Sequence, residues 1–181
     1  MSTATADTPD DALVSQYVSG DTAAFDRLYA RYRERVWAYA YRASGFDTHR
    51  AADVCQDTWL RVVKGAPGYA ARGRFDRWVF GIAHNVIVDH HRRQQPTPSE
   101  PDTLPDLADF VHRFEVTDTL EQVLSTLRAD QRSALLLHYV EGYTLDEIAA
   151  LQSSGRETIK SRVRYGLNAL RDRLGGTHGT H

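Results

Sequence analysis

Apolar residues recur three or four positions apart along most of this chain, the spacing that places them on one face of an α-helix. The first such run consists of Phe25, Leu28, Tyr29, Tyr32, Val36, Tyr39 and Ala40. It predicts an amphipathic helix that begins after Asp21, a favourable N-cap residue, and continues to about Ala43. Two further runs predict helices over about 52–63 and 75–93, separated by a loop that contains glycine and proline.

The same spacing returns in the C-terminal third of the chain. Leucine-containing runs predict helices near 120–127 and 135–140. Thr144, followed three residues later by Glu147, forms a capping-box pattern that begins a further helix. The last helix carries an apolar stripe made of Ile159, Val163, Leu167, Leu170 and Leu174. Because no segment alternates apolar and polar residues as a strand does, we predict an all-α protein.

A polar stretch rich in proline separates these two sets of helices. Residues 95–115 contain four prolines, and Arg113 alone opposes the acidic residues Glu100, Asp102, Asp106, Asp109 and Glu115. We therefore expect two small helical domains, residues 12–94 and 116–175, joined by an acidic linker over 95–115. Residues 1–11 and 176–181 are expected to be tails, the first of them disordered.

The overall charge conceals an uneven distribution. The formal net charge is -2, yet basic residues cluster near 72–93 and again near 156–173. Such clusters attract phosphates locally, whatever the total charge. The single cysteine excludes an internal disulfide and is typical of a reducing compartment, and no stretch approaches the ~18 apolar residues of a membrane span. We therefore expect a cytoplasmic protein.

The stretch "TLDEIAALQSSGRETIKSRV", residues 144–163, has the organisation of a helix-turn-helix. A capped helix is followed by a polar break and a second helix with basic residues outside its apolar stripe. The N-terminal part of such a helix enters the DNA major groove, where Arg and Lys meet guanine edges or phosphates. We expect the basic side chains to lie on faces other than the core face: Arg156, Lys160, Arg162 and Arg164.

A longer stretch, "YTLDEIAALQSSGRETIKSRVRYGLNALRDRL", resembles region 4 of the extracytoplasmic-function (ECF) sigma factors of the sigma-70 family. Two earlier stretches are similar to region 2 of the same family: "DVCQDTWLRVV" to region 2.2 and "RFDRWVFGIAHNVIVDHHRR" to regions 2.3 and 2.4. The resemblance covers residues 12–174 in the order found in the family. It implies an alternative sigma factor, which is not an enzyme and needs no cofactor or metal.

The resemblance also implies partners and binding residues. Region 2 binds the clamp helices of core RNA polymerase, which points to Asp53, Gln56, Asp57 and Arg61. Region 2 also melts the promoter -10 element, which points to Arg72, Arg74, Asn85, Asp89, Arg92 and Arg93. Region 4 binds the -35 element, which points to Arg156, Glu157, Lys160, Ser161, Arg162 and Arg164. Aromatic residues near the region 2 loop, Tyr69, Phe75 and Trp78, suit the stacking or packing that flipped bases require.

Two departures from the family pattern concern DNA binding. Ser153 and Ser154 replace the usual glycine and Val or Ile of the turn. Because glycine adopts positive φ readily, we expect a less tight turn here. His84 replaces a usual arginine, which weakens the charge facing the -10 element unless the histidine is protonated.

A third departure lies at the start of region 2.2, where the family often has Asp-Ala-Glu-Asp. Here the residues are Arg50, Ala51, Ala52 and Asp53, so two acidic side chains are missing and one has become arginine. This change is expected to weaken docking to a basic clamp. A phosphate on Thr48 would restore negative charge near a helix N-terminus. We therefore put forward the hypothesis that a Ser/Thr kinase activates the protein at Thr48, with an anti-sigma protein as the alternative control.

Two other functions compete with this interpretation. A stand-alone helix-turn-helix regulator would bind duplex DNA without polymerase, but it leaves the region 2 resemblance unexplained. The stretch "VIVDHH", residues 86–91, resembles the Asp-His-His signature of a metal-dependent phosphoesterase family. That motif follows a buried strand in its family, whereas here it continues a helical pattern.

Overall fold

The computed structural model describes residues 8–92 and 118–175, and these contain helices and no strand. The all-α prediction is therefore confirmed for the described residues. Residues 93–117, which hold the predicted acidic linker and Arg93, lie outside them. In chain order the elements are α1 (Asp10–Val18), α2 (Thr22–Ala43), α3 (Thr48–Gly65), the 3₁₀ turn η1 (Ala66–Gly68), α4 (Phe75–Arg92), α5 (Asp118–Thr126), α6 (Ala129–Tyr139), α7 (Leu145–Leu151) and α8 (Arg156–Gly175).

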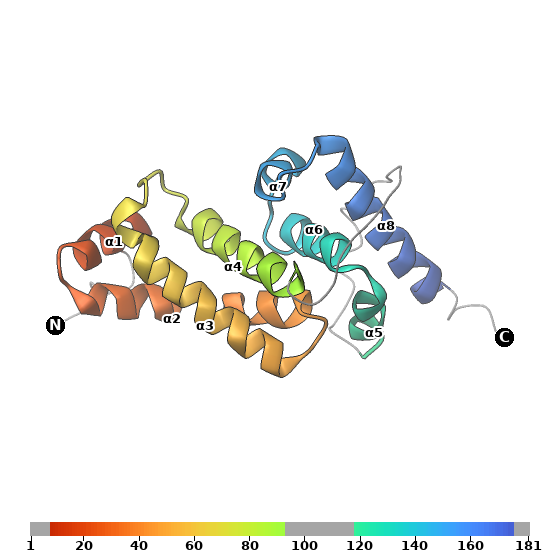
Figure 1. Cartoon of the computed structure of the whole chain (residues 1–181), viewed down its shortest axis with the longest axis horizontal. Coiled ribbons are helices and arrows are strands. Elements are labelled where there is room, and N and C mark those ends of the chain that lie inside the picture. Colours follow the sequence, from red (N-terminus) through yellow and green to blue (C-terminus); the bar gives the residue numbers. More distant parts are fainter. Residues whose placement is uncertain (1–7, 93–117, 176–181) are drawn as a thin grey trace.

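Helices α1–α4 form one group, with α3 lying against both α2 and α4 (Figure 1). The predicted cap of α2 is present, since the Asp21 carboxylate accepts a hydrogen bond of 3.0 Å from the backbone N–H of Ala23. A similar cap begins α3, where the Asp47 carboxylate accepts a hydrogen bond of 3.1 Å from the backbone N–H of Arg50. This cap explains why α3 begins at Thr48, several residues before the apolar run that predicted it.

Helix α1 begins at Asp10, inside the stretch that was expected to be a disordered tail. Its buried residues Leu13 and Val14 pack into the core. Asp10 accepts hydrogen bonds from Arg31 and Tyr32 of α2 and so fixes the start of α1 against that helix. The composition of the first eleven residues therefore predicted too long a tail.

Helices α5–α8 form the second group, in which α8 packs against α5, α6 and α7 (Figure 1). The capping box that begins α7 is confirmed, because Thr144 and Glu147 exchange side-chain and backbone hydrogen bonds. In the turn between α7 and α8, Ser153 has φ +47°. The positive φ expected of a glycine is thus adopted by a serine, which costs conformational energy but keeps the turn.

The two groups pack against each other through α2, α5 and α6. Arg132 of α6 lies at the centre of this junction and is only 4% exposed. Its guanidinium donates 2.9 and 3.1 Å hydrogen bonds to the backbone oxygen of Ala43, the last residue of α2. It also donates to the backbone oxygens of Leu124 and Leu127. One buried side chain therefore joins the first helix group to the second.

Candidate functional site

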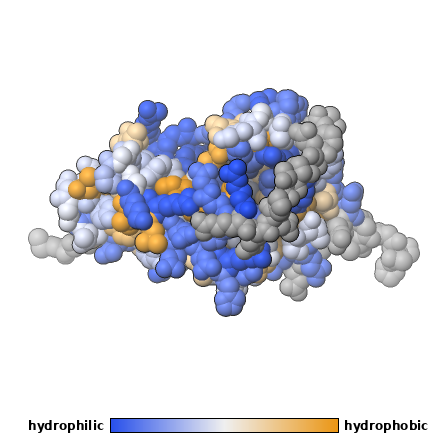
Figure 2. Space-filling view, viewed as in Figure 1, coloured by the Kyte–Doolittle hydropathy of each residue, from blue (hydrophilic) through white to orange (hydrophobic). Residues whose placement is uncertain are grey.

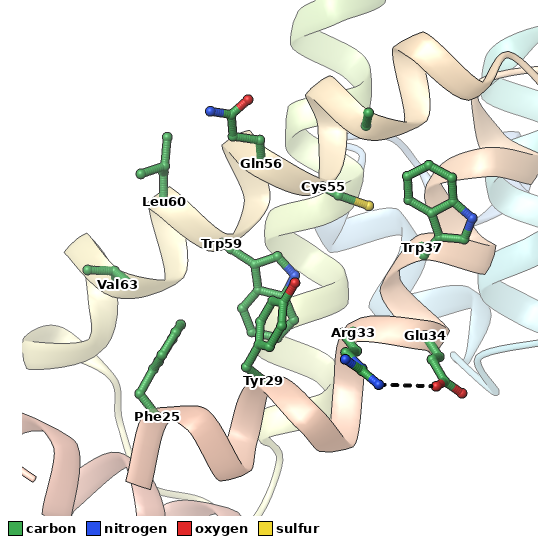
Figure 3. Close-up of a pocket in the computed structure, with 11 residues that line it drawn as sticks. Phe25, Tyr29, Arg33, Glu34, Trp37, Cys55, Gln56, Trp59, Leu60 and Val63 are labelled. Atoms are coloured by element: carbon green, nitrogen blue, oxygen red, sulfur yellow. Dashed lines mark ion pairs between the residues drawn. The ribbon is translucent and has the colours of Figure 1, made fainter. Parts of the chain in front are cut away.

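An apolar groove runs between α2 and α3. Figure 3 shows Tyr29 and Trp59 facing each other across it, and their ring centroids are 4.9 Å apart. The residues that line the groove are mostly apolar: Phe25, Tyr29, Arg33, Glu34, Trp37, Ala52, Cys55, Gln56, Trp59, Leu60 and Val63. Four of them are exposed large hydrophobic side chains: Tyr29, Trp37, Leu60 and Val63. Contiguous exposed apolar surface of this kind marks a protein-binding site.

The distribution of surface polarity agrees with a docking face on the first helix group. On the face drawn in Figure 2, apolar surface gathers over the half that holds α1–α4, and the α7–α8 end is mainly hydrophilic. The sequence had suggested only polar polymerase contacts on α3. The apolar docking face could have been found from Leu60 and Trp37, which are apolar residues outside the buried stripes of their helices.

The four predicted polymerase contacts do not all lie at this groove. Gln56 lines the groove, and Asp53 is exposed one helical turn before it on α3. Asp57 and Arg61 instead face α4. Asp57 lies 2.9 Å from His90, and Arg61 donates a hydrogen bond of 2.7 Å to Asp89. The side chains at 57 and 61 therefore help to hold α3 against α4.

The predicted -10 residues lie in the loop before α4 and along α4 itself. Arg72 is exposed in the loop, and Arg74 forms an ion pair with Glu147 of α7. Three further candidates line a cleft between the two helix groups: Asn85, Asp89 and Arg92. Arg162 of α8 lies on the opposite side of the same cleft, so region 2 and region 4 candidates face each other there.

The predicted -35 residues divide into two sets. Arg156, Glu157 and Lys160 lie at the start of α8 and form surface ion pairs with one another or with Asp146. Arg162 instead lines the cleft and binds Gln152, Ser154 and Asp130 of its own helix group. Among the predicted -35 residues, the exposed ones are Arg156 and Glu157 in the first turn of α8.

The expectation that Arg164 lies away from the core is wrong. Arg164 is 5% exposed, and Ser161 is 6% exposed with its hydroxyl bonded to the backbone oxygen of Glu157. Helix α8 packs against three helices, so its buried surface is wider than the stripe of Ile159 and Val163 suggested. Neither side chain is placed to reach DNA in this arrangement.

A second set of contacts joins the start of α4 to the turn between α6 and α7. Arg77 donates hydrogen bonds to the backbone oxygens of Glu141 and Gly142, and its guanidinium lies 4.3 Å from the centre of the Tyr143 ring. The Glu141 carboxylate accepts a hydrogen bond of 2.8 Å from Arg35 of α2. Sequence patterns gave no signal for these contacts, because each pairs residues more than sixty positions apart.

His84, expected to face the -10 element, is buried at the junction and 1% exposed. Its Nδ1 lies 3.2 Å from the Ser133 hydroxyl and 3.4 Å from the Tyr39 hydroxyl. Burial and, after it, the nearby Arg162 charge lower the pKa of His84 to about 4. His84 is thus neutral near pH 7 and supplies no charge to DNA.

We expect acid to weaken the junction through His84. The histidine pKa is about 4 when folded, against about 6.5 when unfolded, so the unfolded chain binds the proton more readily. The stabilising contribution is complete above pH 6.5 and is lost as pH falls toward 4, at a limiting rate of about 1.4 kcal/mol per pH unit. Urea unfolding between pH 7 and pH 4.5 should show a smaller pH dependence for His84→Gln than for wild type. Equal dependence in both proteins would contradict this assignment.

The Asp-His-His stretch lies inside α4, where no strand precedes it in the described residues. Asp89 and His90 are paired with Arg61 and Asp57 of α3. Within the described ranges, no group of three His, Cys, Asp or Glu side chains is arranged to hold a metal ion. The stretch therefore serves helix packing, and the phosphoesterase resemblance has no structural support.

None of the described helices is both long enough and apolar enough to cross a bilayer.

Comparison with known proteins places both helix groups in families. Sigma-70 region 2 matches residues 28–97, and Sigma-70, region 4 matches residues 123–172. The ECF RNA polymerase sigma factor SigC of Mycobacterium tuberculosis is 30% identical over 173 residues, which cover 93% of this chain and 92% of SigC. CarQ of Myxococcus xanthus, an RNA polymerase sigma factor, is 31% identical over 90% of this chain and 95% of CarQ. SigE of Mycolicibacterium smegmatis is 31% identical over 86% of this chain, which spans 65% of the length of SigE.

Two solved structures share the fold. The sigma factor RpoE from Bartonella quintana, in complex with the anti-sigma factor NepR, has a TM-score of 0.65 at 22% identity, covering 83% of this chain and 96% of RpoE. CnrH in complex with the cytosolic domain of CnrY has a TM-score of 0.66 at 23% identity, covering 93% of this chain and 99% of CnrH.

The two helix groups are therefore regions 2 and 4 of a transcription initiation factor of the sigma-70 type. Within that class the chain belongs to the ECF RNA polymerase sigma factors, which are not enzymes.

Proposed function

We propose that this protein docks on core RNA polymerase through the groove between α2 and α3. The observation that carries the proposal is the set of exposed apolar side chains there, beside Gln56 and Asp53. Burial of such side chains supplies most of the free energy of a protein interface, and the exposed polar neighbours give it specificity. Because polymerase works in the cytoplasm, the proposal also places the protein there.

We propose further that the loop before α4 and the cleft side of α4 bind the -10 element, and that the first turn of α8 binds the -35 element. Arg72 and Asn85 are exposed in the first surface, and Arg156 is exposed and Lys160 half-exposed in the second. Arg74 can reach a phosphate only by exchanging its ion pair with Glu147. Promoter binding thus competes with one contact between the two regions.

Fluorescence titration and co-elution with purified core polymerase test the docking proposal. A submicromolar complex is expected, together with little affinity of the free protein for duplex DNA. A protein that bound duplex promoter DNA tightly and ignored polymerase would be a stand-alone helix-turn-helix regulator.

The finer proposal is that a phosphate on Thr48 strengthens docking. Thr48 is exposed in the first turn of α3, next to the Asp47 cap and Arg50. A phosphate there adds about two negative charges at the positive end of the helix dipole and opposes the Arg50 charge. Control by an anti-sigma protein, the kind of partner present with RpoE, is the alternative.

We expect Thr48→Glu to bind core polymerase about 5- to 10-fold more tightly than Thr48→Gln, which has a similar size without the charge. The titration described above measures the difference. Equal affinity of Thr48→Glu, Thr48→Gln and wild type would rule out the charge mechanism and leave control to an anti-sigma protein.

A further inference from the structure

The loop between η1 and α4 is held by a residue of α1, far away in the sequence. The two oxygens of the Asp11 carboxylate bind two different points of that loop. Oδ1 accepts a hydrogen bond of 2.7 Å from the hydroxyl of Tyr69. Oδ2 accepts a hydrogen bond of 2.6 Å from the backbone N–H of Gly73. One carboxylate thus fixes the distance between the beginning and the end of the loop.

Both oxygens of the Asp11 carboxylate bind the loop, and the neighbouring Asp10 has different partners. In the first turn of α1 it is Asp10, not Asp11, that binds Arg31 and Tyr32 and fixes the helix to α2. The ion pair between α1 and α2 is that of Asp10 with Arg31. The two aspartates are adjacent and have the same charge, but they have separate structural roles.

Each of the two loop groups that bind Asp11 is itself held in a definite position. The Tyr69 ring packs on Trp78 and Phe75, with centroids 4.9 and 5.8 Å away, so its hydroxyl is presented from a fixed ring. Gly73 has φ +65°, a conformation that turns the chain sharply and favours glycine. Its N–H points to Asp11 because of that turn.

The residues on either side of Gly73 are Arg72 and Arg74, two of the proposed -10 contacts. The direction in which both arginines leave the loop therefore depends on the turn that Asp11 holds. A loop without this anchor would have to be ordered when DNA binds, and the lost conformational entropy would reduce the strength of binding.

We propose that Asp11 is a positioning residue for promoter opening, which holds loop 69–74 in the shape that presents Arg72 to the -10 strand, and Arg74 once it has left Glu147. This proposal rests on the sigma-factor function proposed above. Asp11 contacts no DNA itself and acts through the loop. Tyr69 is its partner in the same role.

The test measures two steps separately for the holoenzyme: affinity of the protein for core polymerase, and permanganate reactivity of -10 thymines. Templates are enriched from a library with random -35 and -10 segments by the wild-type holoenzyme. We expect Asp11→Ala and Tyr69→Phe each to lower the open-complex signal about 5- to 10-fold. Core affinity should stay within about twofold of wild type, because the groove between α2 and α3 is untouched.

The double variant distinguishes positioning from general loss of structure. Tyr69→Phe removes one of the two contacts that Asp11→Ala removes, so the double variant Asp11→Ala with Tyr69→Phe should be about as defective as Asp11→Ala alone. Asp10→Asn, the matched control, should reduce thermal stability without a specific loss of opening. Normal opening by Asp11→Ala would overturn the proposal, as would a parallel loss of core affinity and opening in both aspartate variants. Failure of the wild-type holoenzyme to open any template would instead overturn the sigma-factor function, and this proposal with it.

Discussion

Leu60→Asp is expected to weaken binding to core polymerase by about 30- to 100-fold while the protein stays folded. Leu60 is 49% exposed on α3 at the edge of the apolar groove (Figure 3), so the free protein does not depend on it for its core. In the complex the leucine would be buried. Its loss removes about 2 kcal/mol of apolar burial, and a carboxylate in its place adds a desolvation cost.

A matched control uses an equally exposed apolar residue away from the groove. Val18 is 48% exposed at the end of α1, so Val18→Asp should leave core affinity within about twofold of wild type. Titration of labelled core polymerase gives the affinities, and circular dichroism shows that both variants are folded. Equal affinity of Leu60→Asp and wild type would place the polymerase interface elsewhere.

The second large effect is expected for stability. Arg132→Ala removes a buried guanidinium that binds the backbone oxygens of Ala43, Leu124 and Leu127. Those oxygens would be left without their donor beside a cavity, at a cost of about 1–3 kcal/mol each before water or relaxation offsets part of it. We expect a loss of about 3 kcal/mol in the free energy of unfolding.

Arg128→Ala is the control for the charge change, because Arg128 lies at the start of the same helix with a half-exposed side chain paired to Asp130. It should change stability by less than about 0.5 kcal/mol. Urea unfolding of the whole chain measures both variants. A small effect of Arg132→Ala would mean that the two helix groups do not depend on this junction.

The helices and their capping residues were the most predictable part of the fold, because both depend on nearby residues. Asp21 and the pair Thr144 and Glu147 have capping chemistry that three or four residues can specify. Helix α1 was missed because it is short and its acidic first turn has the composition of a tail. Only its contacts with α2 and the loop show why it folds.

The site was predicted less completely than the fold, because it depends on contacts between distant segments. The order of the two sigma regions was evident from their motifs, and the comparisons confirmed it. Burial of His84 and Arg164 could not be predicted, since it follows from the packing of one helix group on the other and of α8 on three neighbours. The family resemblance had placed both side chains near DNA.

Transcription by purified core polymerase on the library with random -35 and -10 segments tests the central claim most directly. With the protein added, we predict transcripts that begin at fixed distances downstream of one shared pair of sequence elements, and none of these transcripts with core polymerase alone. Replacing Arg156 and Lys160 should relax selection at the upstream element only. If the protein binds the library DNA by itself, and adding it to polymerase produces no new start sites, the sigma-factor account is wrong.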